Sequence, residues 1–327
     1  MNKLLVLLGV LGVVSMHGMA QECKSIYQLE NHASRTGYVS TTGKHCLTYD
    51  IVQSRVFDIH AGGDKTLSTA LMEISYPDEY LDRSKHKFVR NSPWVEGSNF
   101  DIDLQGHLLK SDEENSIGVR ALGGIRHVLV RNGTVVVPGA RSSLGVSLQN
   151  GDGDLRIAGL PSYANRKSVS YADYEDLPAS EALDKKAPSY QPTGNLVEHV
   201  TIHAGWRGVV MAGGGNVLRD STIDVDGHTA VYMYGPGSII ENNTIIIHGK
   251  GDAKPFDAAI KLRDAHGAVV RNNRIIYKGG WFGKAPAAVN LLDSTDVQIE
   301  GNTVENFDKL VRVNGESKYA EKGNSLK

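Results

Sequence analysis

The sequence predicts an all-β solenoid, in which short parallel strands stack in successive coils. Three observations point to this fold class. A short motif of strand, polar turn and strand recurs along the chain, a second apolar strand follows each copy, and the copies are almost evenly spaced. Each strand is too short to be stable alone, but stacking equivalent strands of neighbouring coils buries a continuous core.

The recurring motif is an apolar strand, a polar pair, then Thr or Arg, and another apolar strand. Copies begin at Val130, Val197, Leu218, Ile240, Val270 and Ile299, with a weaker copy at Val95. In the last five copies the fifth position is residue 201, 222, 244, 274 and 303, so the gaps are 21, 22, 30 and 29 residues. A coil of about 22 residues, with two coils enlarged by roughly eight, explains these gaps.

Side chains alternate between the two faces of a strand, so the strand after each turn should point every second residue into the core. The first inward column should hold Ile202, Ile223, Ile245 and Ile275, and the second Ala204, Val225, Ile247 and Tyr277. The second strand set lies at 208–211, 230–233, 259–262, 288–291 and 310–313, with earlier members at 118–121 and 145–148. Paired asparagines at 242–243 and 272–273 tolerate the tight turns and can hydrogen-bond along the stack.

The start of the chain has the features of a secretory signal peptide over residues 1–20. Lys3 precedes an apolar run at 4–14, and the small residues at 18–20 suit cleavage after Ala20. The apolar run is too short to span a bilayer, and no later stretch is long enough. We therefore expect a secreted or periplasmic protein without a membrane span.

The rest of the chain divides into four parts. Residues 21–90 are irregular and should cap the open first coil, and residues 91–315 should form the solenoid. Within it, residues 155–194 hold four tyrosines and four prolines and break the repeat. We interpret them as an insertion that leaves the coil stack, either functional or a mobile loop. The polar tail at 316–327 is expected to fray.

Charge and cysteine content restrict the function classes further. The formal net charge is −2, so no basic excess indicates nucleic-acid binding. The chain has two cysteines, Cys23 and Cys46, which could form a disulfide in an oxidising compartment. The alternative is that both are buried free thiols.

The repeat resembles that of parallel β-helix, pectate-lyase-like proteins over roughly residues 95–315. The resemblance implies a right-handed parallel β-helix with an N-terminal cap, and it is specific for the fold but not for one activity. Polysaccharide lyases are common among the proteins that the chain resembles. The chain lacks the paired-Asp motifs of polygalacturonases, the Asp-Pro-His-Asp signature of alginate epimerases and the Arg-x-Pro-x-x-Arg run of classical pectate lyases.

The leading candidate site is a basic and aromatic patch on outward positions of the second strand set. Neighbouring coils should place Tyr232 and Tyr234 beside Lys261 and Arg263, about 4.8 Å away. We expect this patch to be solvent-exposed and to act in β-elimination on an acidic polysaccharide. Cations would neutralise the uronate carboxylate and a Lys, Arg, Tyr or His would remove the C5 proton. Lys261 is the expected base, Arg263 and Arg312 the expected neutralisers, and either tyrosine the expected proton donor.

Further residues should support this patch. His228 precedes the tyrosine strand, Asn290 extends the row, and the wide turns carry Phe256 and Trp281 as sugar-stacking platforms. Against this interpretation, lysines and arginines on a solenoid strand most often form a solvated face.

A second candidate site combines carboxylates and histidines on the first strand set. Asp224 and Asp226 point the same way from one strand, near His203 and His248. Paired carboxylates could act as acid and base in a glycosidase or could bind Ca²⁺. No other cofactor or metal is predicted. A third interpretation is a non-catalytic glycan-binding or surface-structural solenoid.

Overall fold

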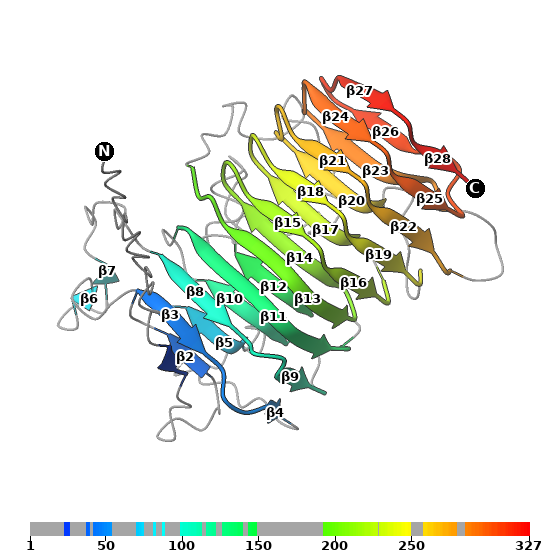
Figure 1. Cartoon of the computed structure of the whole chain (residues 1–327). Coiled ribbons are helices and arrows are strands. Elements are labelled where there is room, and N and C mark those ends of the chain that lie inside the picture. Colours follow the sequence, from blue (N-terminus) through cyan, green and yellow to red (C-terminus); the bar gives the residue numbers. More distant parts are fainter. Residues whose placement is uncertain are drawn as a thin grey trace, which may run out of the picture.

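The computed structural model describes most of the solenoid and parts of the N-terminal region. The described residues are 23–26, 37–39, 42–53, 70–74, 81–82, 87–88, 99–112, 116–121, 126–139, 143–148, 192–227, 229–249, 258–279 and 285–327. Within these ranges all regular elements are strands, and Figure 1 shows them side by side in a ladder of coils. None of the described segments is a helix long and apolar enough to cross a membrane. The predicted all-β parallel solenoid is confirmed.

The first sheet is parallel, and from β15 onward each coil contributes two short strands to it. Its strands are β1 (Lys24–Ser25), β3 (Gly43–Cys46), β4 (Ile51–Gln53), β8 (Phe100–Asp103), β9 (Leu108–Ser111), β11 (Val128–Val137), β13 (Leu196–Ala204), β15 (Val217–Arg219), β16 (Thr222–Val225), β18 (Ile239–Glu241), β19 (Thr244–Ile247), β21 (Val269–Arg271), β22 (Arg274–Tyr277), β24 (Val297–Glu300), β25 (Thr303–Glu305), β27 (Tyr319–Lys322) and β28 (Ser325–Leu326).

The second sheet is also parallel and takes one strand from each coil. Its strands are β2 (Gly37–Val39), β5 (Ala70–Ile74), β10 (Ile117–Ala121), β12 (Leu144–Leu148), β14 (Arg207–Ala212), β17 (Thr229–Tyr234), β20 (Ala258–Arg263), β23 (Ala287–Leu292) and β26 (Val311–Asn314). A separate antiparallel pair is formed by β6 (Leu81–Asp82) and β7 (Lys87–Phe88).

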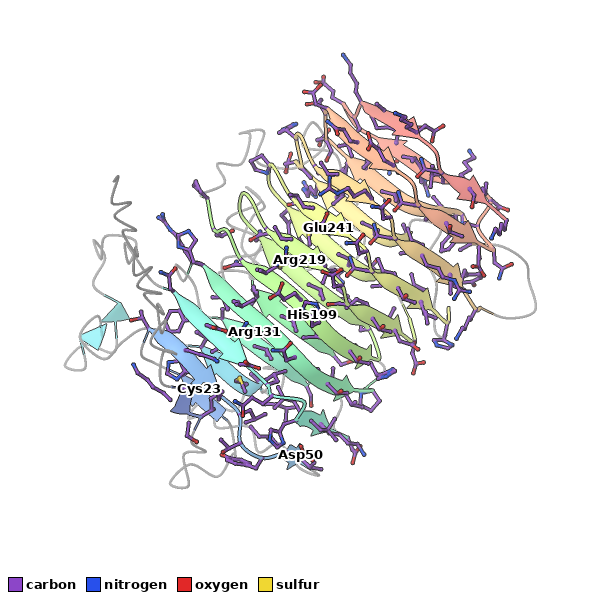
Figure 2. The ribbon with its side chains drawn as sticks, in the orientation of Figure 1. Cys23, Asp50, Arg131, His199, Arg219 and Glu241 are labelled. Carbon is purple, nitrogen blue, oxygen red and sulfur yellow. A yellow bond between two sulfur atoms is a disulfide. The ribbon has the colours of Figure 1, made fainter. Side chains whose placement is uncertain are left out.

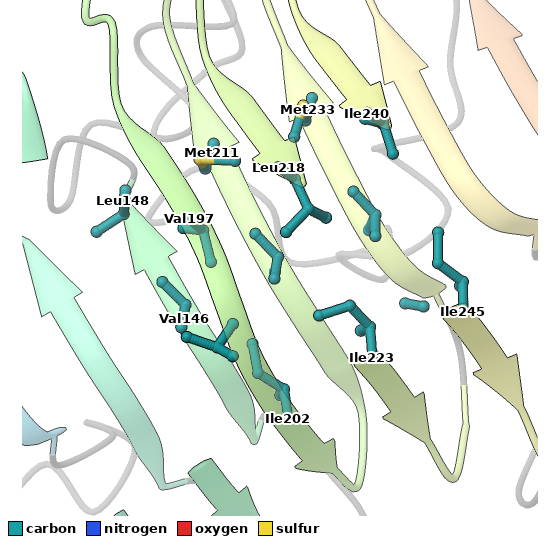
Figure 3. Close-up of a cluster of buried hydrophobic side chains, with 14 of the residues drawn as sticks. Val146, Leu148, Val197, Ile202, Met211, Leu218, Ile223, Met233, Ile240 and Ile245 are labelled. Carbon is teal, nitrogen blue, oxygen red and sulfur yellow. The ribbon is translucent and has the colours of Figure 1, made fainter. Parts of the chain in front are cut away.

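The core lies between the two sheets, and the predicted isoleucine column runs through it. Ile202, Ile223, Ile245 and Ile275 pair in register on neighbouring coils, and all four are fully buried. Figure 3 shows three of them in sequence, with a second column of Val197, Leu218 and Ile240 beside them. Full burial of each such side chain stabilises the fold by about 1.5–3 kcal/mol.

A ladder of asparagines holds the turns of the first sheet together, as the sequence predicted. The side-chain NH₂ groups of Asn243 and Asn273 each donate to the side-chain oxygen of the next asparagine, Asn273 and Asn302, at 3.0 Å. Asn302 continues to Asn324 at the same distance. Each of these NH₂ groups also donates to a backbone carbonyl of the neighbouring coil. The buried turns therefore keep their polar groups satisfied.

The stacking begins earlier in the chain than the repeat does. β3 pairs in parallel with β8, and β5 pairs with β10, so described residues between 21 and 90 already belong to the two sheets. They were expected to be irregular apart from a strand-like stretch at 51–60, and they do not carry the polar-pair motif. Main-chain pairing does not require that motif. Whether residues 21–90 also cap the stack remains a prediction.

The expectation of a frayed tail is wrong. β27 and β28 pair in register with β24 and β25, and Asn324 adds the last rung of the asparagine ladder. Strand pairing here depends on main-chain groups, so a polar sequence does not prevent it. The predicted signal peptide at 1–20 lies outside the described residues, as does most of the predicted insertion. Its last residues, from Pro192, are already bonded to the coil at Gly214.

The predicted disulfide is present and joins Cys23, just before β1, to Cys46, the last residue of the neighbouring strand β3. We expect neither thiol to react with an alkylating reagent until the protein is reduced, which mass measurement will show. Cys46→Ser should lower the free energy of unfolding by about 3 kcal/mol, because the bridge restricts the unfolded chain. Alkylation of both cysteines without reduction would contradict the bridge.

Candidate functional site

The outer face of the second sheet brings together the residues of the leading candidate. Register pairing places Tyr232 beside Lys261 and Tyr234 beside Arg263, on β17 and β20. The row continues through Asn290 on β23 to Arg312 on β26. We call these six residues the tyrosine–cation row. The predicted adjacency of its members is confirmed.

The predicted exposure of this row is wrong. Tyr232, Tyr234, Lys261, Arg263 and Asn290 are each at most 3% exposed, and Arg312 is half-buried. Alternation along a strand predicts which face of the sheet a side chain lies on, but it does not predict whether that face is exposed to solvent. The row is therefore a buried polar cluster rather than a solvated surface.

Ring contacts make the row compact. The rings of Tyr232 and Tyr234 are stacked, with centroids 4.1 Å apart. The guanidinium of Arg207 lies 5.2 Å from the centroid of the Tyr232 ring and 4.0 Å from that of Trp206. Arg207 is 1% exposed. Cations over aromatic faces are held electrostatically, most strongly where water is excluded.

Sequence reasoning missed Arg207. Simple alternation from the core residue Val209 assigns Arg207 to the inward face. The strand departs from alternation at Gly208, where an added Cβ would lie 2.2 Å from the side chain of the core residue Ile223. Gly208 therefore faces the core, and Arg207 takes the outer face. Gly208 was the available signal, because a residue without a side chain fits where the backbone comes so close to the core.

The chemistry available to the row follows from its charges. Arg207, Lys261, Arg263 and Arg312 are cations on one sheet within five successive coils. In a site with little water, cations stabilise developing negative charge far more than they do at a solvated surface. Two tyrosine hydroxyls and one lysine amine are groups that can transfer protons in this environment.

The second candidate site lies on the outer face of the first sheet. Nε2 of His248 is 2.8 Å from Oδ1 of Asp224, and Nδ1 of His203 is 3.8 Å from the other carboxylate oxygen. The side chains of His203, Asp224 and His248 are 49%, 21% and 26% exposed, so this His–Asp cluster is accessible to solvent. Asp226 follows β16 and is half-buried. A carboxylate that holds an imidazole in place can prepare it for proton transfer.

Three predicted site residues, His228, Phe256 and Trp281, lie outside the described residues. Among the side chains that the structure describes, no group of three or more His, Cys, Asp or Glu is arranged to hold a metal ion. The predicted possibility of Ca²⁺ binding therefore gains no support from them.

Comparison with known proteins adds the handedness of the fold. A family described as a right-handed beta helix region matches residues 189–325. Searches of curated proteins and of solved structures found no match. Together with the stacked parallel strands, the family match defines a right-handed parallel β-helix protein. The fold class and the resemblance predicted from the repeat are confirmed. The family match does not indicate a particular activity, because one fold supports many functions.

Proposed function

We propose that the chain is an exported carbohydrate-active enzyme, a lyase that cleaves an acidic polysaccharide by β-elimination. The observation that carries this proposal is the register of the tyrosine–cation row, which sets tyrosines directly beside cations on adjacent strands. The predicted signal peptide and the disulfide between Cys23 and Cys46 support export.

In the proposed reaction Arg263 and Arg312 bind the uronate carboxylate. Their charge makes the C5 proton more acidic, and Lys261 removes it as the base. Tyr232 or Tyr234 donates a proton to the departing glycosidic oxygen. The product is a new reducing end and an unsaturated uronate, so no water is consumed.

The test is to incubate the full mature protein with a panel of acidic polysaccharides and follow ultraviolet absorbance and reducing ends together. A lyase raises both signals. Reducing ends without ultraviolet absorbance would replace the lyase with a hydrolase, and binding without either signal would favour a non-catalytic glycan-binding solenoid. Because the row is buried, we expect Lys261 to resist acetylation in the free protein.

The His–Asp cluster supports a second candidate function, a glycoside hydrolase. The favouring observation is that this cluster is exposed and hydrogen-bonded, whereas the tyrosine–cation row is buried. Asp224 would serve as one carboxylate and Asp226 as the other, with the imidazoles of His203 and His248 beside Asp224.

The effect of Asp224→Asn separates the two candidates. If the lyase proposal holds, this substitution should change the rate of polysaccharide cleavage by less than about threefold, since Asp224 lies on the other sheet. If the hydrolase holds, loss of an acid or base should slow cleavage by at least about 100-fold. His203→Asn tests the contribution of His203 separately, because it removes the more distant imidazole and keeps the hydrogen bond between His248 and Asp224.

A further inference from the structure

The outer face of the first sheet carries a row of charges that alternate in sign from coil to coil. In register order this charge row is Asp103, Arg131, Glu198, Arg219, Glu241, Arg271, Glu300 and Lys322. Figure 2 labels Arg131, Arg219 and Glu241 along this face. Strict alternation suits neither a polyanion nor a polycation, but it can match a second alternating row.

An aliphatic stripe runs beside the charge row, two residues earlier on the same strands. Its members pair in register over five successive coils and are Leu129, Leu196, Val217, Ile239 and Val269. They face outward, because the next residue of each strand lies in the core, and all five are only half-buried. Aliphatic side chains gathered outside the core in this way mark an association surface.

The ion pairs within the charge row leave hydrogen-bonding groups unused. Nε and Nη2 of Arg219 both donate to Oε2 of Glu198, at 2.8 and 2.6 Å. Arg271 binds Oε2 of Glu241 in the same way, and the two arginine side chains are 41% and 48% exposed. Among the described residues, none bonds to Nη1 of either arginine or to the second oxygen of either glutamate. A guanidinium can bind a second carboxylate with its remaining N–H groups.

The charge row is complementary to a reversed copy of itself. Two copies can face each other with antiparallel coil axes and a two-fold axis between the coils of Arg219 and Glu241. Arg219 of each copy then faces Glu241 of the other, and Arg271 faces Glu198, so each ion pair meets an inverted ion pair. The two-fold axis makes each of these contacts occur twice. A slip by one coil would place like charges opposite each other, so the charges select one register.

The same alignment places the two aliphatic stripes against each other. Val217 faces Ile239 of the second copy, and Leu196 faces Val269. Leu129 faces Gln298, which is uncharged and continues the line of the stripe on the next coil. The alignment therefore buries apolar side chains without placing an ionised group against them, and this burial supplies affinity.

We propose that the protein forms a symmetric dimer through the aliphatic stripe and the charge row, with the two solenoids antiparallel. The eight coils of the row make a strip about 34 Å long. Association over one narrow strip should be weak, with a Kd on the order of micromolar. The tyrosine–cation row lies on the other sheet, so the dimer is independent of the proposed lyase reaction.

Sedimentation of the full mature protein over about 1–300 µM tests the dimer, since this range brackets a micromolar Kd. The single variants Arg219→Glu and Glu241→Arg each create two like-charge contacts across the two-fold axis. Each should raise the Kd by at least about 30-fold. An equimolar mixture of the two variants should dimerise again, because every introduced charge then faces an opposite one.

Arg274→Glu is the matched control. It makes the same charge reversal on the first sheet and removes an exposed ion pair with Glu305, but it lies beyond the turn and outside the strip. Its Kd should stay within about threefold of the original. A protein that remains monomeric at the highest concentration would overturn the proposal. A dimer that both single variants retain, or a mixture that fails to restore it while both variants keep their melting temperature, would also overturn it.

Discussion

Lys261→Met is expected to slow cleavage of the acidic polysaccharide by at least about 100-fold, the effect of removing a general base. Lys261 is 3% exposed, so alanine would also remove packed methylene groups and confuse lost chemistry with lost stability. Methionine keeps most of the volume and removes only the amine. The initial rate of ultraviolet absorbance increase, measured beside the melting temperature, gives both quantities.

Val210→Ala is the matched control, since Val210 occupies the same outward position two coils earlier, next to Tyr232, and is also buried. Its rate should stay within about threefold of the original. A Lys261→Met protein that cleaves normally would remove Lys261 as the base. Combined with a large loss in Asp224→Asn, that result would transfer the proposal to the His–Asp cluster.

Asn273→Ala is expected to lower the free energy of unfolding by about 3 kcal/mol. The Asn273 side chain donates to Ile240 and Asn302 and accepts from the backbone and side chain of Asn243. Alanine leaves several of these buried groups without partners, and each such loss costs about 1–3 kcal/mol unless water enters. Denaturant unfolding followed by circular dichroism measures the difference.

Asn324→Ala provides the comparison at the open end of the same ladder. Asn324 is only half-buried, so water can replace its hydrogen bonds and the loss should be about 1 kcal/mol. Equal effects of the two substitutions would mean that the ladder does not act through buried, water-excluded hydrogen bonds.

Periodic spacing explains why so much of the fold was predictable. The isoleucine column at Ile202, Ile223 and Ile245 follows from a fixed coil length and from alternation along a strand, and both are local properties of the sequence. The asparagine ladder is predictable for the same reason. Where the motif is absent, as in β2 and β5, main-chain pairing builds the second sheet without it.

The sequence predicted which residues of each candidate site lie side by side on adjacent strands. It did not predict the other contacts of these residues. Register placed Tyr232 beside Lys261 and Asp224 beside His203, as counting along the repeat had indicated. The hydrogen bond from His248 to Asp224 crosses diagonally between coils, which counting does not specify. The pattern also missed Arg207, because a single glycine shifts the alternation of β14.

The sequence by itself determined that this protein is a stack of parallel coils and which side chains share each column, because a repeat converts position along the chain into position in space. Only the tertiary structure decided that the tyrosine–cation row is buried and that the His–Asp cluster is accessible. Burial depends on which segments distant in sequence pack over a face, and that packing is not encoded in the period of the repeat.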